Sequence, residues 1–94
     1  MIVRFVKLEI QKQHIQHFKD LTTKEKANIL SFEGCSHLEV LQDLSNPCTF
    51  FTVSHWSSED ALNQYRNSDF FQANWKSVKQ WFSDKPEAWS LWQQ

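Results

Sequence analysis

The residue of this sequence with the clearest chemical potential is an acid on an apolar helix face. A helix predicted over residues 14–32 carries an apolar stripe, and at about 100° per residue Glu25 falls in the middle of it. The stripe consists of Ile15, Phe18, Leu21, Ile29 and Phe32. A charge aimed at a core is costly unless it is partnered or hydrated, so two interpretations remain open. Either the helix tilts or breaks near Thr22 and Thr23 and leaves Glu25 in solvent, or Glu25 lies on the wall of a polar cavity between helix and sheet.

An arginine in the first predicted strand is the second candidate. Arg4 alternates with strand positions that look buried, namely Ile2, Val6 and Leu8. Such an arginine could pair with Glu25 or Glu39, or it could bind an anionic substrate. The alternative is a strand-end arginine whose guanidinium group reaches solvent.

Histidine 37 is the candidate proton acceptor outside the helix. His37 alternates with apolar neighbours on a predicted strand, and so does His55 on the next strand, which is also the pattern of a hydrogen-bonded structural histidine. In the catalytic interpretation, Glu25 or His37 takes a proton from the substrate. Arg4 or His37 then stabilises the anion that forms.

Several residues of the second half could line the same cavity. The candidates for substrate binding are Thr52, Trp56, Tyr65, Asn74 and Trp75. Asn74 lies within an arc of aromatic residues, so it is either a hydrogen-bonding residue of a pocket or a polar residue at a helix edge. The two tryptophans also fit ordinary core positions, and Tyr65 fits an amphipathic helix edge.

Composition and spacing exclude several other kinds of site. No His, Cys, Asp or Glu cluster has metal-ligand spacing, and a chain with 1 Gly has no glycine-rich phosphate loop, so we expect no metal and no cofactor. The net charge of −1, without a basic run, argues against nucleic-acid binding. Cys35 and Cys48 are too few for a disulfide framework and are predicted to lie roughly 20 Å apart across a hairpin.

Length and aromatic content bound the organisation of the chain. The 94 residues are expected to form a single domain, residues 1–94. The longest apolar run is far short of a bilayer span, and the first residues lack the order of a signal peptide, so we expect a cytoplasmic protein without a membrane partner. Aromatic residues make up 15% of the chain, more than one small core easily encloses. Some rings should therefore lie in a subunit interface or a pocket.

The expected elements follow from periodicity and caps. Strands are predicted over residues 2–10, 36–43, 48–56 and 88–92, with the first helix stopped by Gly34. Two further helices begin at Ser57, with Asp60 in a capping-box position, and at Ser68. This β-α-β-β-α(α)-β order predicts an α+β, ferredoxin-like βαββαβ fold with a four-stranded antiparallel sheet and helices on one face. The other face would expose Val3 and Phe5, so we expect a homodimer packed sheet against sheet.

The strand and helix starts also carry a resemblance to a known family. The pattern Trp56-x-Ser58-x-x-Ala61-x-x-x-Tyr65, followed by Ser68-x-Phe70-Phe71, resembles the antibiotic biosynthesis monooxygenase family. The resemblance covers nearly the whole chain and implies a dimeric α+β barrel. Family members that are enzymes oxygenate aromatic polyketides or quinols with molecular oxygen, without metal or flavin, and Trp56 matches the family's pocket tryptophan.

The haem-degrading branch of that family fits less well. Where that branch has an axial histidine on the last long helix, this chain has Trp75, and where it has an asparagine on the first strand, this chain has Val6. Tryptophan does not ligate iron, which disfavours haem oxygenation. A histidine elsewhere, such as His37, could in principle bind haem.

These observations lead to one main hypothesis and two alternatives. The main hypothesis is a cofactor-independent monooxygenase acting on a small aromatic compound of the phenol, quinol or polyketide type. Its catalytic residues would be His37, Glu25 and Arg4, beside the substrate-binding residues named above. The alternatives are a non-catalytic dimeric module that binds an aromatic metabolite or haem, and a dimer with a structural role only.

Overall fold

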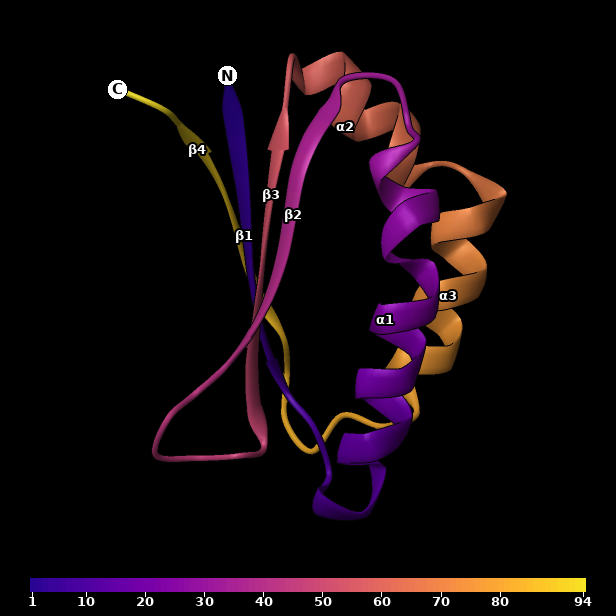
Figure 1. Cartoon of the computed structure of the whole chain (residues 1–94), viewed down its shortest axis with the longest axis vertical. Helices are drawn as coiled ribbons and strands as arrows, with labels where there is room; N and C mark the ends of the chain where they lie inside the picture. Colours follow the sequence, from indigo (N-terminus) through magenta and orange to yellow (C-terminus); the bar gives the residue numbers. More distant parts are fainter.

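The computed structural model describes residues 1–94 as one sheet with a layer of helices on one of its faces (Figure 1). The elements in chain order are β1 (Ile2–Glu9), the short 3-10 helix η1 (Lys12–His14), α1 (Ile15–Leu30), β2 (Cys35–Gln42), β3 (Thr49–Trp56), α2 (Glu59–Arg66), α3 (Asp69–Lys79) and β4 (Glu87–Trp92). The strands and the first helix lie within two residues of their predicted bounds. None of the helices combines the length and apolar character needed to cross a bilayer.

All neighbouring strands of the sheet are antiparallel. The strand order is β2-β3-β1-β4, so β3 and β1 are the central strands and β2 and β4 are the edge strands. The last strand of the chain, β4, pairs with the first, β1. The helices α1, α2 and α3 all lie on the same side of this sheet (Figure 1). The predicted α+β, ferredoxin-like fold is confirmed.

Serine side chains start the two later helices. The Ser68 hydroxyl accepts a hydrogen bond from the backbone N–H of Phe71 at 3.1 Å, as predicted. For α2 the predicted cap, Ser57, is wrong by one residue, because the hydroxyl that accepts from the Ala61 N–H, at 3.1 Å, belongs to Ser58. The Ser58 cap fixes where α2 begins after β3, and the Ser68 cap fixes where α3 begins after α2.

The turn between α1 and β2 depends on the single glycine. Gly34 has φ +88°, and an added Cβ would lie 2.6 Å from the Ala61 Cβ and 2.7 Å from the Ser57 Oγ. Its carbonyl accepts a hydrogen bond from the Ser57 N–H at 2.8 Å. The prediction that Gly34 is the first residue after the helix cap is wrong, because α1 ends at Leu30 and its C-cap is Ser31. Gly34 instead lets the start of β2 approach the start of α2 closely.

Two apolar clusters hold the helices to the sheet, one near each end of β1. One is built around Leu8, Ile10, Phe18, Phe50 and Val78. The other is built around Ile2, Trp56 and Leu62, with Tyr65 packed against it. Between the buried residues of the two clusters along β1 lie Arg4 and Val6, which are only partly buried. The middle of the helix–sheet layer is therefore filled less completely than its two ends.

The opposite face of the sheet has no helix over it (Figure 1) and carries a patch of apolar side chains among polar ones. The Phe5 ring contacts Phe51 and Trp89 with edge-on geometry, at centroid distances of 5.5 and 6.2 Å. Trp89 and Leu91 keep 42% and 47% of their surface exposed. We call this surface the open face, defined by Val3, Phe5, Phe51, Val53, Trp89 and Leu91. It is the surface predicted to be left uncovered.

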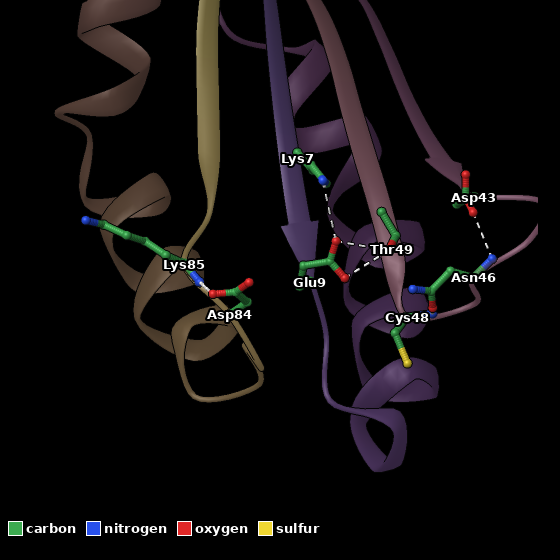
Figure 2. Close-up of polar contacts among 8 residues, drawn as sticks. All are labelled: Lys7, Glu9, Asp43, Asn46, Cys48, Thr49, Asp84 and Lys85. Atoms are coloured by element: carbon green, nitrogen blue, oxygen red, sulfur yellow. Dashed lines mark hydrogen bonds and ion pairs between the residues drawn. The ribbon is translucent and has the colours of Figure 1, made fainter.

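Polar contacts secure the end of the sheet where β2 turns into β3, as Figure 2 shows. The Asp43 carboxylate accepts from the Asn46 N–H at 2.8 Å, which closes the turn. On the open-face side, the Thr49 hydroxyl donates to the Glu9 carboxylate at 2.9 Å. Cys48 lies at this end and Cys35 at the opposite end of the hairpin, and both thiols are free.

Candidate functional site

A cavity of about 570 Å³ lies between the sheet and the helices, in the gap between the two apolar clusters. Its floor includes Arg4 and Val6 of β1 and Thr52 and Ser54 of β3. Pockets that hold drug-sized ligands have volumes of about 300–1,000 Å³. The space is therefore large enough for a small organic molecule.

The cavity opens toward the edge of the sheet formed by β4. Its exposed lining residues are Arg66, Asn67, Gln72 and Ala88. Every residue of β4 is exposed, because no helix covers this edge strand. A ligand can thus enter between β4 and the segment that joins α2 to α3.

Glu25 lies on the cavity wall, where α1 crosses the sheet. The residue is 9% exposed, and its Oε2 accepts a hydrogen bond from the Asn28 Nδ2 at 2.9 Å. The helix continues unbroken through Thr22 and Thr23. A solvent-exposed Glu25 would have required the helix to tilt or break there. Thr22 instead bonds back along the helix, with its Oγ1 donating to the Lys19 carbonyl at 3.0 Å. The cavity interpretation of Glu25 therefore agrees with its position.

Arg4 also faces the cavity and has no carboxylate partner. Its Nη1 donates to the Ser90 Oγ of β4 at 2.9 Å, and neither Glu25 nor Glu39 forms an ion pair with it. Burial lowers the pKa of the Arg4 guanidinium, and the nearby charge of Arg66 lowers it further. The site thus holds two neighbouring cations.

Sequence reasoning missed Arg66. It is the last residue of α2, where a cation stabilises the helix dipole, so its residue type there needs no other explanation. No periodicity connects it with Arg4, because the two residues come from a helix and a strand far apart in the sequence. Only the packing of α2 over the sheet brings both to one cavity.

Aromatic rings form one wall of the cavity. The Trp75 ring stacks on Phe71 at 5.8 Å and 13°, and Tyr65 contacts Phe71 edge-on at 5.1 Å. Tyr65 also stacks on Trp56 at 5.0 Å. Burial, and secondarily Cys35, raises the pKa of the Tyr65 hydroxyl well above its usual range. Tyr65 lines the cavity, and its hydroxyl forms no hydrogen bond within the protein and is not fully buried.

Six of the eight predicted site residues line this cavity. They are Arg4, Glu25, Thr52, Tyr65, Asn74 and Trp75. Trp56 does not line it: the side chain is 0% exposed, and its Nε1 donates to the Ser54 Oγ at 2.9 Å behind the cavity wall. Trp56 supports Tyr65 from behind rather than touching the cavity itself.

His37 is the other predicted residue outside the cavity. It lies on the sheet face opposite the helices, with its Nε2 2.6 Å from the Glu39 Oε1 and its ring 4.8 Å from that of His55. The cause is alternation along β2, since Leu38 and Val40 line the cavity and His37 therefore lies on the other face, paired with His55. The β-bulge between Cys35 and His37 instead places Cys35, paired with Trp56, on the helix side.

The cavity therefore combines groups with complementary chemistry. Glu25 can accept a proton, the two arginines can stabilise an anion, and the Tyr65 hydroxyl can donate a hydrogen bond to a ligand. Flat rings can hold an aromatic ligand between them. No group of three or more His, Cys, Asp and Glu side chains that could hold a metal ion is present.

Comparisons with known proteins place the chain in a family. Among solved structures, a conserved protein from Methanosarcina mazei has 24% identity and a TM-score of 0.92, over 100% of this chain and 94% of that chain. An antibiotic biosynthesis monooxygenase has 13% identity and a TM-score of 0.91, over 99% and 98% of the two chains. A Mycobacterium tuberculosis protein has 11% identity and a TM-score of 0.90, over 99% and 94%. At these identities the likeness shows the fold.

The sequence comparison is more specific. No curated protein sequence matches the chain. The sequence model of the antibiotic biosynthesis monooxygenase family matches residues 1–77, which include Arg4, Glu25 and the whole aromatic wall. The protein belongs to the antibiotic biosynthesis monooxygenase family.

Proposed function

We propose that the protein is a cofactor-independent monooxygenase of a small phenol or quinol, with the cavity as its active site. The observation that carries the proposal is the presence of Glu25, Arg4 and stacked aromatic rings around one open cavity of about 570 Å³. The family membership and the name of a structural relative as a monooxygenase support the reaction type.

In the proposed mechanism the substrate supplies the electrons. Its ring lies against Trp75, and Thr52 and Asn74 hydrogen-bond its oxygen atoms. Glu25 accepts the phenolic proton, and Arg4 stabilises the phenolate in a cavity that shields it from bulk water. The electron-rich phenolate then transfers an electron to molecular oxygen from solution, and the resulting radicals combine to form a peroxide.

The atoms and electrons balance without a cofactor. For a quinol, one atom of the oxygen molecule enters the ring and the other leaves as water. The quinol supplies all four electrons and becomes a hydroxyquinone. Tyr65 remains protonated throughout, because its pKa is raised, and donates a hydrogen bond to the substrate.

The decisive experiment is oxygen uptake with a panel of hydroquinones and naphthohydroquinones. We expect Glu25→Gln to lower the rate about a hundredfold or more, because an amide cannot accept the proton. Glu33→Gln removes a carboxylate from an exposed turn outside the cavity and should leave the rate unchanged. Hydroquinone binding without oxygen uptake above the Glu25→Gln level would contradict catalysis.

The proposed assembly is a homodimer in which the open faces of two copies pack together. The support is the exposure of Trp89 and Leu91 beside the Phe5 cluster, since a contiguous apolar patch commonly marks an interface. The cavity lies on the other side of the sheet. Dimerisation would therefore leave its helix-side wall in place.

A further inference from the structure

Two cations share the cavity, and neither forms an ion pair. Arg4 and Arg66 both line it, whereas the only ion pairs of the chain lie on the opposite face of the sheet. The guanidinium group of Arg4 has one hydrogen bond, to the Ser90 hydroxyl, and that of Arg66 has none. Most of the donors of both groups are therefore free to bind a ligand.

The arrangement has a cost that a ligand would offset. Like charges near each other oppose folding, and the lowered pKa of Arg4 reflects both its burial and the charge of Arg66. An anion bound between the two groups would form charge-assisted hydrogen bonds with both, and planar guanidinium groups suit a planar anion. Glu25 lines the same cavity, but its carboxylate accepts from Asn28 and forms no ion pair with either arginine.

We propose that the substrate carries a carboxylate group, which Arg4 and Arg66 bind together at the opening of the cavity. The inference rests on the proposed function for the reaction, but it adds the class of substrate: an aromatic hydroxy acid. The exposed Arg66 marks the opening, and the buried Glu25 marks the inner wall. The carboxylate therefore stays at the opening, and the hydroxyl group that loses its proton points inward toward Glu25. In such a substrate Arg4 binds the carboxylate directly and favours the phenolate only through its positive charge.

The surroundings favour a carboxylate over a phosphate ester. Phosphate sites commonly use free N–H groups at a helix N-terminus. Here α3 begins with Asp69, and its Phe71 N–H is already bonded to Ser68. The α2 helix begins at Glu59, at the opposite end of the helix from Arg66. The first residues of α2 and α3, Glu59 and Asp69, do not line the cavity, so neither helix start offers its N–H groups to a phosphate there.

Binding of naphthoate tests the inference without turnover, because naphthoate is not a quinol. The quenching of tryptophan fluorescence measures the binding. The neutral, nearly isosteric partner of naphthoate is naphthamide. We expect wild-type protein to bind naphthoate at least about tenfold more tightly than naphthamide, and added salt to reduce the difference. The substitutions Arg66→Gln, at an exposed position, and Arg4→Gln should each abolish most of the preference for naphthoate over naphthamide. The substitution Lys24→Gln removes the same charge from the exposed side of α1 and should leave this preference unchanged.

Three results would overturn the inference. They are equal affinity for naphthoate and naphthamide, unchanged naphthoate affinity in Arg66→Gln, and naphthyl phosphate binding about tenfold more tightly than naphthoate. Its failure is distinct from failure of the proposed function. Oxygen uptake with neutral quinols but no preference for acids would remove only the inference, whereas arginine-dependent naphthoate binding without any oxygen uptake would remove only the catalysis.

Discussion

Tyr65 is the residue whose protonation the fold controls most strongly. Its ring is enclosed by Trp56, Phe32 and Phe71, and this burial, with Cys35 nearby, raises the pKa of its hydroxyl. A tyrosine hydroxyl is protonated at neutral pH, and the raised pKa keeps that of Tyr65 protonated further into the alkaline range. In the proposed active site it acts as a hydrogen-bond donor and not as a base.

The raised pKa of Tyr65 predicts a loss of stability in alkali. Above the ordinary tyrosine pKa of about 10, the unfolded chain loses the proton while the folded protein keeps it, so unfolding becomes more favourable as pH rises. Below about pH 10 the contribution is unchanged. Urea unfolding of wild type and Tyr65→Phe on both sides of this value should show a smaller alkaline loss for the variant. Equal losses in the two proteins would contradict the assignment, since all other groups are shared.

The sequence was informative at single positions only where a residue type conflicted with its surroundings. Glu25 stood out because a carboxylate lay inside an apolar stripe, and the structure places it on the cavity wall. Arg66 did not stand out, because an arginine at a helix C-terminus is ordinary. Its place in the site depends on tertiary packing, which no local pattern encodes.

At the scale of elements, the helix caps are the simplest features to test. Ser58→Ala should lower the free energy of unfolding by about 1 kcal/mol, because the Ala61 N–H loses its acceptor. Ser57→Ala should cost less, since the Ser57 hydroxyl caps no helix. Urea denaturation of both variants measures the difference. A larger effect at Ser57 would place the cap where the sequence pattern first suggested it.

The turn glycine makes a second prediction for the same region. Gly34→Ala should destabilise the protein by more than about 1 kcal/mol, because it strains a left-handed residue and pushes a methyl group against Ala61 and Ser57. Thermal unfolding measures the change. Gly34→Ala with an unchanged melting temperature would show that the α1–β2 turn is not held as tightly as described.

Element boundaries and fold order were predictable because periodicity, serine caps and turn residues agreed with one another. The face of His37 was predictable too, because His37 alternates with Leu38 and Val40, both of which line the cavity on the helix side. The face of Cys35 was not. In a regular strand it would share the face of His37, but a bulge separates the two residues and places Cys35 in a core cluster. A bulge leaves no reliable mark in a single sequence.

For the whole molecule, the open face predicts the assembly state. Leu91→Asp should convert a dimer, of twice the 11.3 kDa chain mass, to a monomer, because it places a charge in the apolar contact. Leu30→Asp, at a 36% exposed position of α1, is the matched control and should stay dimeric. Light scattering after size-exclusion chromatography measures both. A monomeric wild-type protein in dilute solution would refute the proposed assembly.

The existence of a two-sided apolar sheet could be predicted from alternation along the strands, but the size and opening of the cavity could not. They depend on how far α3 and the α2–α3 segment stand from β4, and that spacing is set by packing at the two distant core clusters. Glu25 and Arg4 indicated polar space under the helices. Only the folded chain shows that the two arginines meet at one opening.

The proposed enzyme transfers one atom of molecular oxygen to a bound quinol without a cofactor. Turnover of a naphthohydroquinone under isotopically labelled oxygen gas, with mass spectrometry of the product, tests this most directly. We predict one labelled oxygen atom per product molecule in wild type and none above background in Glu25→Gln. Unlabelled product, or hydrogen peroxide formed in place of oxygenated product, would contradict it.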